Sequence, residues 1–97
     1  MRRAARIDDN HTEIVDAFRA LGCSVLSLAP MGKGVPDLLI GVACRTYLVE
    51  VKDGSKVPSA RKLTPDEHRF QKSWLGQWTM VESVSDVVAF VKEWRRL

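Results

Sequence analysis

Two carboxylates and a lysine lie in the most apolar part of this 97-residue chain. Asp37 stands at the head of the run LLIGV, and Glu50 and Lys52 close the run TYLVEV. Because side chains on a strand alternate between its two faces, Glu50 and Lys52 point to the same face. Carboxylate oxygens are ligands for hard divalent cations, and a lysine can stabilise negative charge on a reacting group. These residue types could therefore carry metal-assisted chemistry on a phosphate.

The two apolar runs predict a β-hairpin that positions these side chains. A turn at residues 43–44 would place Val42 opposite Arg45, and the same register places Asp37 opposite Glu50. The turn lacks the Asn-Gly or Asp-Gly signal of a tight hairpin, so the register depends on the alternation of apolar residues. In this register two carboxylates meet across neighbouring strands.

Like charges directly opposite each other destabilise a sheet. A divalent cation removes the conflict, since Mg²⁺ is commonly bound by one or two carboxylates together with waters and substrate phosphates. The alternative interpretation is structural: Glu50 and Lys52 solvate the end of a strand, and Asp37 caps a loop. Spacing alone leaves both interpretations open.

The rest of the chain supplies three helices and two more strands. The apolar period predicts a first helix over 9–21, with Asp9 or Asn10 as its cap, and a strand over 23–29 follows. A glycine- and proline-rich loop covers 30–36 and a polar, mobile segment covers 52–62. The second helix, over 63–75, opens with a capping box formed by Thr64 and Glu67 and ends at Gly76. A strand over 78–83 and a last helix over 85–97, capped by Ser85, complete the order α-β-β-β-α-β-α.

Composition indicates one soluble domain over residues 1–97, with no apolar stretch near the roughly 20 residues that span a membrane. The basic start has no apolar region after it, so a secretory signal is not expected. Cys23 and Cys44 form no CxxC pair, and His11 and His68 lack zinc-ligand spacing to them, which indicates free thiols in a reducing cytosol. The net charge of +3 suggests an anionic partner. The cations concentrate after the second apolar run, at Lys52, Lys56, Arg61, Lys62, Arg69 and Lys72.

The motif PD at 36–37 followed by EVK at 50–52, on consecutive apolar strands, resembles the PD-(D/E)XK nucleases. The resemblance extends over about residues 10 to 95 to the VRR-NUC (virus-type replication-repair nuclease) branch, through Glu13, GVPD, EVK, LTPDE and VES. Glu67 stands where many relatives carry glutamine, while Gln71 lies one turn later. This departure leaves the role of that helix open.

The resemblance implies a restriction-endonuclease-like α/β core, with a mixed sheet flanked by helices, that hydrolyses DNA with Mg²⁺ or Mn²⁺. Asp37, Glu50 and the carbonyl of Val51 would hold the metal, and Lys52 would orient a water or stabilise developing charge. Glu13 follows from the resemblance as a further catalytic residue. An ordinary exposed helix glutamate is the alternative. Phosphate contacts would come from Lys33, Lys56, Arg61, Lys62, Arg69 and Lys72.

The resemblance further implies a homodimer that cuts branched DNA such as four-way junctions, in the cytoplasm of a bacterial or phage-infected cell. The apolar stripe of the last helix, with Val87, Val88, Val91 and Trp94, also favours a dimer. The alternatives are a flap or nicking nuclease, a DNA-binding module with a vestigial site, and a structural protein with an accidental motif. Trp74, Trp78 and Trp94 could stack on bases, although their spacing favours core packing.

Overall fold

A computed structural model describes residues 8–97 and confirms the predicted order of helices and strands. The elements are α1 (His11–Ala20), β1 (Ser24–Ser27), β2 (Leu38–Val42), β3 (Arg45–Val51), α2 (Pro65–Ser73), β4 (Trp78–Val81) and α3 (Val84–Arg96). Two short 3₁₀ helices, η1 (Ala29–Met31) and η2 (Pro58–Arg61), lie within the segments expected to be loops. The basic start, on which the expectation about a secretory signal depends, lies outside the described residues except for its last positions. Within the described part of the chain, no helix is both long enough and apolar enough to cross a bilayer.

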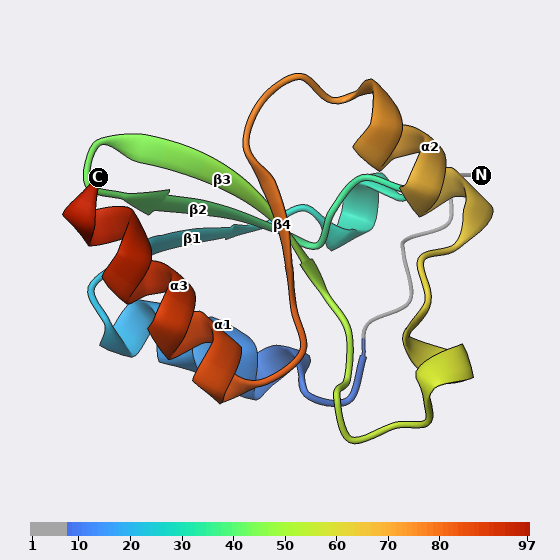
Figure 1. Ribbon diagram of the computed structural model, residues 1–97, viewed down its shortest axis with the longest axis horizontal. Coiled ribbons are helices and arrows are strands. Elements are labelled where there is room, and N and C mark those ends of the chain that lie inside the picture. The colour runs from blue at the N-terminus through green and yellow to red at the C-terminus, as the bar shows by residue number, and fades with distance from the viewer. Residues whose placement is uncertain (1–7) are drawn as a thin grey trace.

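The four strands form one mixed sheet in the order β1-β2-β3-β4. The pairs β1–β2 and β2–β3 are antiparallel, and β3–β4 is parallel. Figure 1 shows α1 and α3 together on one face of the sheet, while α2 lies beyond the end at which β2 begins and β3 ends. The sheet is thus covered by helices on one face only, rather than flanked on both.

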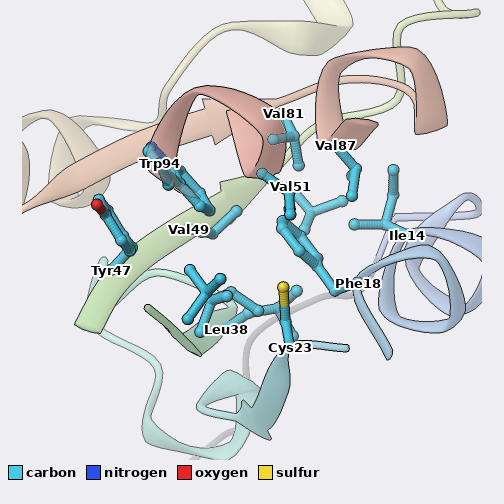
Figure 2. Close-up of a cluster of buried hydrophobic side chains, with 13 residues drawn as sticks. Ile14, Phe18, Cys23, Leu38, Tyr47, Val49, Val51, Val81, Val87 and Trp94 are labelled. Carbon is cyan, nitrogen blue, oxygen red and sulfur yellow. The ribbon is translucent and has the colours of Figure 1, made fainter. Parts of the chain in front are cut away.

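The core fills the space between the sheet and the α1–α3 layer (Figure 2). The helices contribute Ile14, Phe18, Val87, Val91 and Trp94, and the strands contribute Leu38, Ile40, Val42, Tyr47, Val49, Val51 and Val81. Trp94 stacks on Tyr47 with ring centroids 3.9 Å apart. Each large side chain fully buried here contributes about 1.5–3 kcal/mol. Because Val87, Val91 and Trp94 of the α3 stripe pack into this core, they no longer argue for a dimer, and Val88 alone of the stripe is exposed.

The helix ends differ from the predicted ones. Ser83, not Ser85, caps α3: its hydroxyl accepts the backbone N–H of Asp86 at 3.2 Å. The second helix ends at Ser73, before Gly76, because Trp74 already has extended backbone angles of φ −76° and ψ 125°. Boundaries of this kind depend on the backbone of one or two residues, which apolar periodicity does not determine.

The hairpin has the predicted register, with Val42 paired with Arg45. Ala43 and Cys44 both have positive φ, at 52° and 60°. Two central residues with φ above zero are typical of a type I′ turn, which normally uses Asn and Gly. The alternation of the strands therefore fixes the register even though the turn residues are unfavourable.

Candidate active site at the end of the sheet

Asp37 and Glu50 meet at the end of the sheet, on the face away from α1 and α3. The register pairs Leu38 with Val49, so one further step sets Asp37 opposite Glu50. Both side chains are buried, with exposed fractions of 6% for Asp37 and 3% for Glu50. Asp37 Oδ2 accepts the backbone N–H of Val51 at 2.8 Å. The predicted pair of carboxylates is thus formed, and one member is held by the strand that carries the other.

Apolar neighbours make this position costly for a charge. Glu50 lies opposite Met80 on β4, and the buried Leu48 precedes it on the same face. Burial, together with the charge of Asp37, raises the pKa of Glu50 to about 10. Burial also raises the pKa of Asp37, although the N–H of Val51 opposes the shift. Burial and the neighbouring carboxylate thus both disfavour ionisation of this pair.

Lys52 lies between two carboxylates. Its Nζ is 3.6 Å from Glu50 Oε2 and 2.7 Å from Glu67 Oε1 on α2. Burial would lower the pKa of Lys52, but the hydrogen bond to Glu67 and the charge of Glu50 outweigh it and raise the pKa. Burial would likewise raise the pKa of Glu67, yet the bond from Lys52 lowers it. The ammonium has three donors and the hydrogen bond to Glu67 uses one, so the others can meet a substrate group.

The first turn of α2 is fixed against this site. Glu67 forms the predicted capping box with Thr64: its Oε1 accepts the N–H of Thr64 at 2.8 Å and its own N–H bonds the Thr64 hydroxyl. The same Oε1 binds Lys52. In the loop that precedes Asp37, Gly34 has φ +81°, and a Cβ there would lie 2.3 Å from the carbonyl oxygen of Asp66. Only glycine allows the loop and α2 to approach so closely.

Asn10 connects the site strand to its neighbour. It stands at the N-cap position of α1 but makes no side-chain cap, contrary to the prediction. Instead its Nδ2 donates to the carbonyl oxygens of Lys52, at 3.0 Å, and Glu82, at 3.2 Å. Asn10 is buried, and these bonds hold the ends of β3 and β4 together.

Glu13 does not join the other three predicted catalytic residues. It is exposed on α1, and within the described chain no hydrogen bond or ion pair links it to Asp37, Glu50 or Lys52. It lines a separate hollow of about 860 Å³ together with the acids Asp9, Asp53, Glu82 and Asp86 and one cation, Arg61. A hollow lined by this many acids would repel a phosphate.

The predicted phosphate-binding cations divide into two groups. Lys56 pairs with Asp8 and Asp9, Arg61 with Glu82, and Arg69 with Asp66. Lys33, Lys62 and Lys72 are exposed and make no ion pair within residues 8–97. The second group is therefore the better placed to meet an anion.

The three tryptophans also have different environments. Trp94 is in the core, as predicted, whereas Trp78 is half-buried and Trp74 is 45% exposed. Trp78 belongs to an apolar row across the uncovered face of the sheet, formed by Leu26, Leu39, Leu48 and Trp78 in directly paired positions. Of the three tryptophans, Trp94 alone thus packs in the core.

The donor atoms suit a hard dication. Two carboxylates face each other, and the N–H of Val51 points at Asp37. Since the N–H and C=O of a strand residue point to the same edge, the carbonyl of Val51 is directed to that side as well. Within residues 8–97 no three His, Cys, Asp or Glu side chains are arranged to hold a metal. The protein therefore offers a two-carboxylate site, as Mg²⁺ often uses with waters and phosphate.

Sequence reasoning predicted the carboxylate pair and Lys52 but left the contacts of Glu67 open and missed the tethering by Gly34 and Asn10. The capping-box motif placed Glu67 in the first turn of the second helix, and Lys52 still lacked a second carboxylate partner. These two features together could have indicated the contact between Glu67 and Lys52. Searches against protein-family models, curated proteins and solved structures found no match for this chain.

Proposed function

We propose that this protein is a Mg²⁺- or Mn²⁺-dependent nuclease that hydrolyses phosphodiester bonds in DNA. The observation that carries the proposal is the buried Asp37–Glu50 pair on adjacent strands with Lys52 one step along the same face. The resemblance of PD and EVK to the PD-(D/E)XK nucleases, and of the wider pattern to the VRR-NUC branch, supports the same function.

A structural role explains this arrangement poorly. Removing a carboxylate from water without a compensating cation costs several kcal/mol, and a second carboxylate beside it adds repulsion. Lys52 does not neutralise the pair, because its closer partner is Glu67, at 2.7 Å against 3.6 Å for Glu50. A fold that keeps Asp37 and Glu50 together at this cost is better explained by a bound dication.

Asp37 and Glu50 would hold the metal, with the carbonyl of Val51 as a third donor. A bound Mg²⁺ supplies positive charge to a non-bridging phosphate oxygen and increases the acidity of a nearby water. Lys52 donates a hydrogen bond to Glu67, and its remaining donors can orient the attacking water or stabilise charge that develops on the phosphate. Glu67 keeps this ammonium aimed at the site.

Branched DNA, with four-way junctions foremost, is the substrate class we propose, in the cytoplasm of a bacterial or phage-infected cell. Paired cuts on a junction need two sites, which a two-fold dimer provides. Leu26, which is exposed, and the half-buried Leu39 and Trp78 offer apolar surface for such a dimer. A nuclease that cuts flaps or single strands remains the second candidate, favoured by the exposed Trp74, which stacks on Phe70 at the end of α2.

Nicking of a supercoiled plasmid with Mg²⁺ or Mn²⁺ tests the nuclease. We expect Asp37→Asn and Glu50→Gln to lower the rate by more than about 100-fold, and Lys52→Met by about 100- to 1,000-fold. Glu93→Gln, which changes an exposed carboxylate of α3, is the matched control and should retain the wild-type rate. Metal-dependent nicking that persists in both carboxylate variants would contradict the proposal. Labelled four-way junctions, flaps and splayed arms then rank the substrates.

A further inference from the structure

An aromatic pair at the end of helix α2 lies outside the hydrophobic core. No residue of α2 is buried. Phe70 and Trp74, at the end of this helix, stack with ring centroids 5.4 Å apart and an angle of 17° between their planes. Trp74 is 45% exposed, and the next residue, Leu75, is 99% exposed. Phe70 is half-buried. Aromatic side chains usually bury their surface, so a stacked pair whose outer ring is exposed indicates a binding surface.

Unpaired cations lie at both ends of α2. Lys72 lies in the last turn of α2, between Phe70 and Trp74 in sequence. Lys62 lies two residues before the N-cap of α2, and Lys33 adjoins Gly34, whose backbone touches the first turn of the helix. These three lysines are exposed and form no ion pair within the described residues. The partner of this surface should therefore combine flat apolar groups with negative charge.

We propose that Phe70 and Trp74 form a stacking platform for unpaired bases of single-stranded DNA, which lysines 33, 62 and 72 hold by its phosphates. Single-stranded nucleic acid presents a π-face on every base and a charge on every phosphate, and proteins bind it with this combination of aromatic and basic residues. A duplex hides its base faces, so the platform favours unpaired over paired strands. This inference rests on the proposed function in one respect, which is the choice of DNA as the nucleic acid that is bound.

The platform lies at a useful distance from the candidate site. Seven residues separate Glu67, which binds Lys52, from Trp74. At 1.5 Å per helical residue this is about 10 Å, or about three stacked bases at 3.4 Å each. A strand that leaves a duplex near Lys52 would thus reach the aromatic pair after about three unpaired nucleotides. This arrangement would direct cleavage to positions where a duplex opens.

The test measures binding without cleavage. Fluorescence anisotropy of a labelled 12-nucleotide oligothymidine is recorded in EDTA with the full chain. Trp74→Leu, which keeps an apolar side chain but removes the ring, should weaken binding by about 5- to 100-fold. Leu75→Ala removes exposed apolar surface without an aromatic face and should leave the affinity unchanged.

The salt dependence separates stacking from charge. Lys72→Gln should reduce the slope of log affinity against log salt concentration by about 0.7, the value for one phosphate on a single strand. Trp74→Leu should leave that slope unchanged while it lowers the affinity. Equal effects of Trp74→Leu on oligothymidine and on blunt duplex would overturn the proposal.

The outcomes distinguish this surface from the nuclease. Binding that depends on Trp74, in a protein that nicks no plasmid, would support the platform and contradict the proposed activity. Normal nicking with affinity that is the same in Trp74→Leu would contradict the platform alone. If Trp74→Leu changes the mass measured by light scattering and not the affinity for DNA, the pair is a contact between two copies and the proposal fails.

Discussion

Glutamine in place of Glu50 is expected to stabilise the metal-free protein while it removes the proposed activity. Glu50 is buried beside Asp37 and has a pKa raised from 4.5 to about 10. Glutamine has nearly the same shape and carries no charge at any pH. Its amide N–H₂ is a donor that can face the Asp37 carboxylate. The substitution therefore removes the electrostatic conflict without leaving a cavity.

The magnitude follows from proton linkage. Below pH 4.5 Glu50 is protonated in the folded and the unfolded chain, so its burial carries no ionisation cost. Between pH 4.5 and 10 the folded state binds a proton that the unfolded state has released, so stability falls as the pH rises. At about 1.4 kcal/mol per pH unit, the loss reaches about 3 kcal/mol at pH 7. Glu50→Gln should recover most of it, which raises Tm by about 10 °C or more for a domain of this size.

Urea and thermal unfolding in EDTA at pH 5, 7 and 9 provide the assay, with Glu93→Gln as the control. The stability of the wild type should decline across this range, and the Glu50→Gln variant should show a much flatter dependence. Mg²⁺ should stabilise the wild type more than the variant. If Glu50→Gln is no more stable than the wild type at pH 7, and both proteins depend on pH alike, the buried carboxylates do not repel each other as argued here.

Two further predictions concern backbone positions with positive φ. Gly34→Ala should destabilise the protein by about 1–3 kcal/mol, since φ is +81° and a Cβ would lie 2.3 Å from the carbonyl oxygen of Asp66. The control in the same unfolding experiment is Gly41→Ala, where the atom nearest to the added Cβ is 3.4 Å away. The double substitution Ala43→Asn with Cys44→Gly should stabilise by about 1–2 kcal/mol, because both positions have positive φ. A lower Tm for the double variant would mean that the turn does not adopt the type I′ conformation in solution.

The carboxylate pair could be predicted because it depends on the alternation of apolar and polar residues along the strands, which can be read directly from the sequence. Alternating apolar residues determine which face each strand buries, and a slip of one residue would move that set to solvent. The observed register buries Leu38 and Val49 on the core face, and it brings Asp37 to Glu50. The same reasoning predicted that Lys52 shares the face of Glu50, and the ion pair confirms it.

The supports of the site could not be predicted, because they involve backbone atoms or contacts distant in sequence. Asn10 is a common helix cap, and nothing local indicates that its amide binds the carbonyls of Lys52 and Glu82 instead. Gly34 suggests a turn, yet its close contact with α2 depends on how two segments pack. Glu13 shows the opposite case: a plausible helix position that tertiary packing places away from the carboxylates.

These supports explain how a small domain keeps an unfavourable charge arrangement in place. Repulsion between Asp37 and Glu50 would spread the ends of β2 and β3, where the ladder stops at the Leu38–Val49 pair. Past this pair, Val51 N–H binds Asp37, Asn10 binds the carbonyl of Lys52, and Glu67 binds the side chain of Lys52. Each tether comes from a different segment, so the site geometry depends on the whole fold rather than on the hairpin. A site held in this way would need little rearrangement to bind the proposed metal, because the atoms that would bind it already face each other.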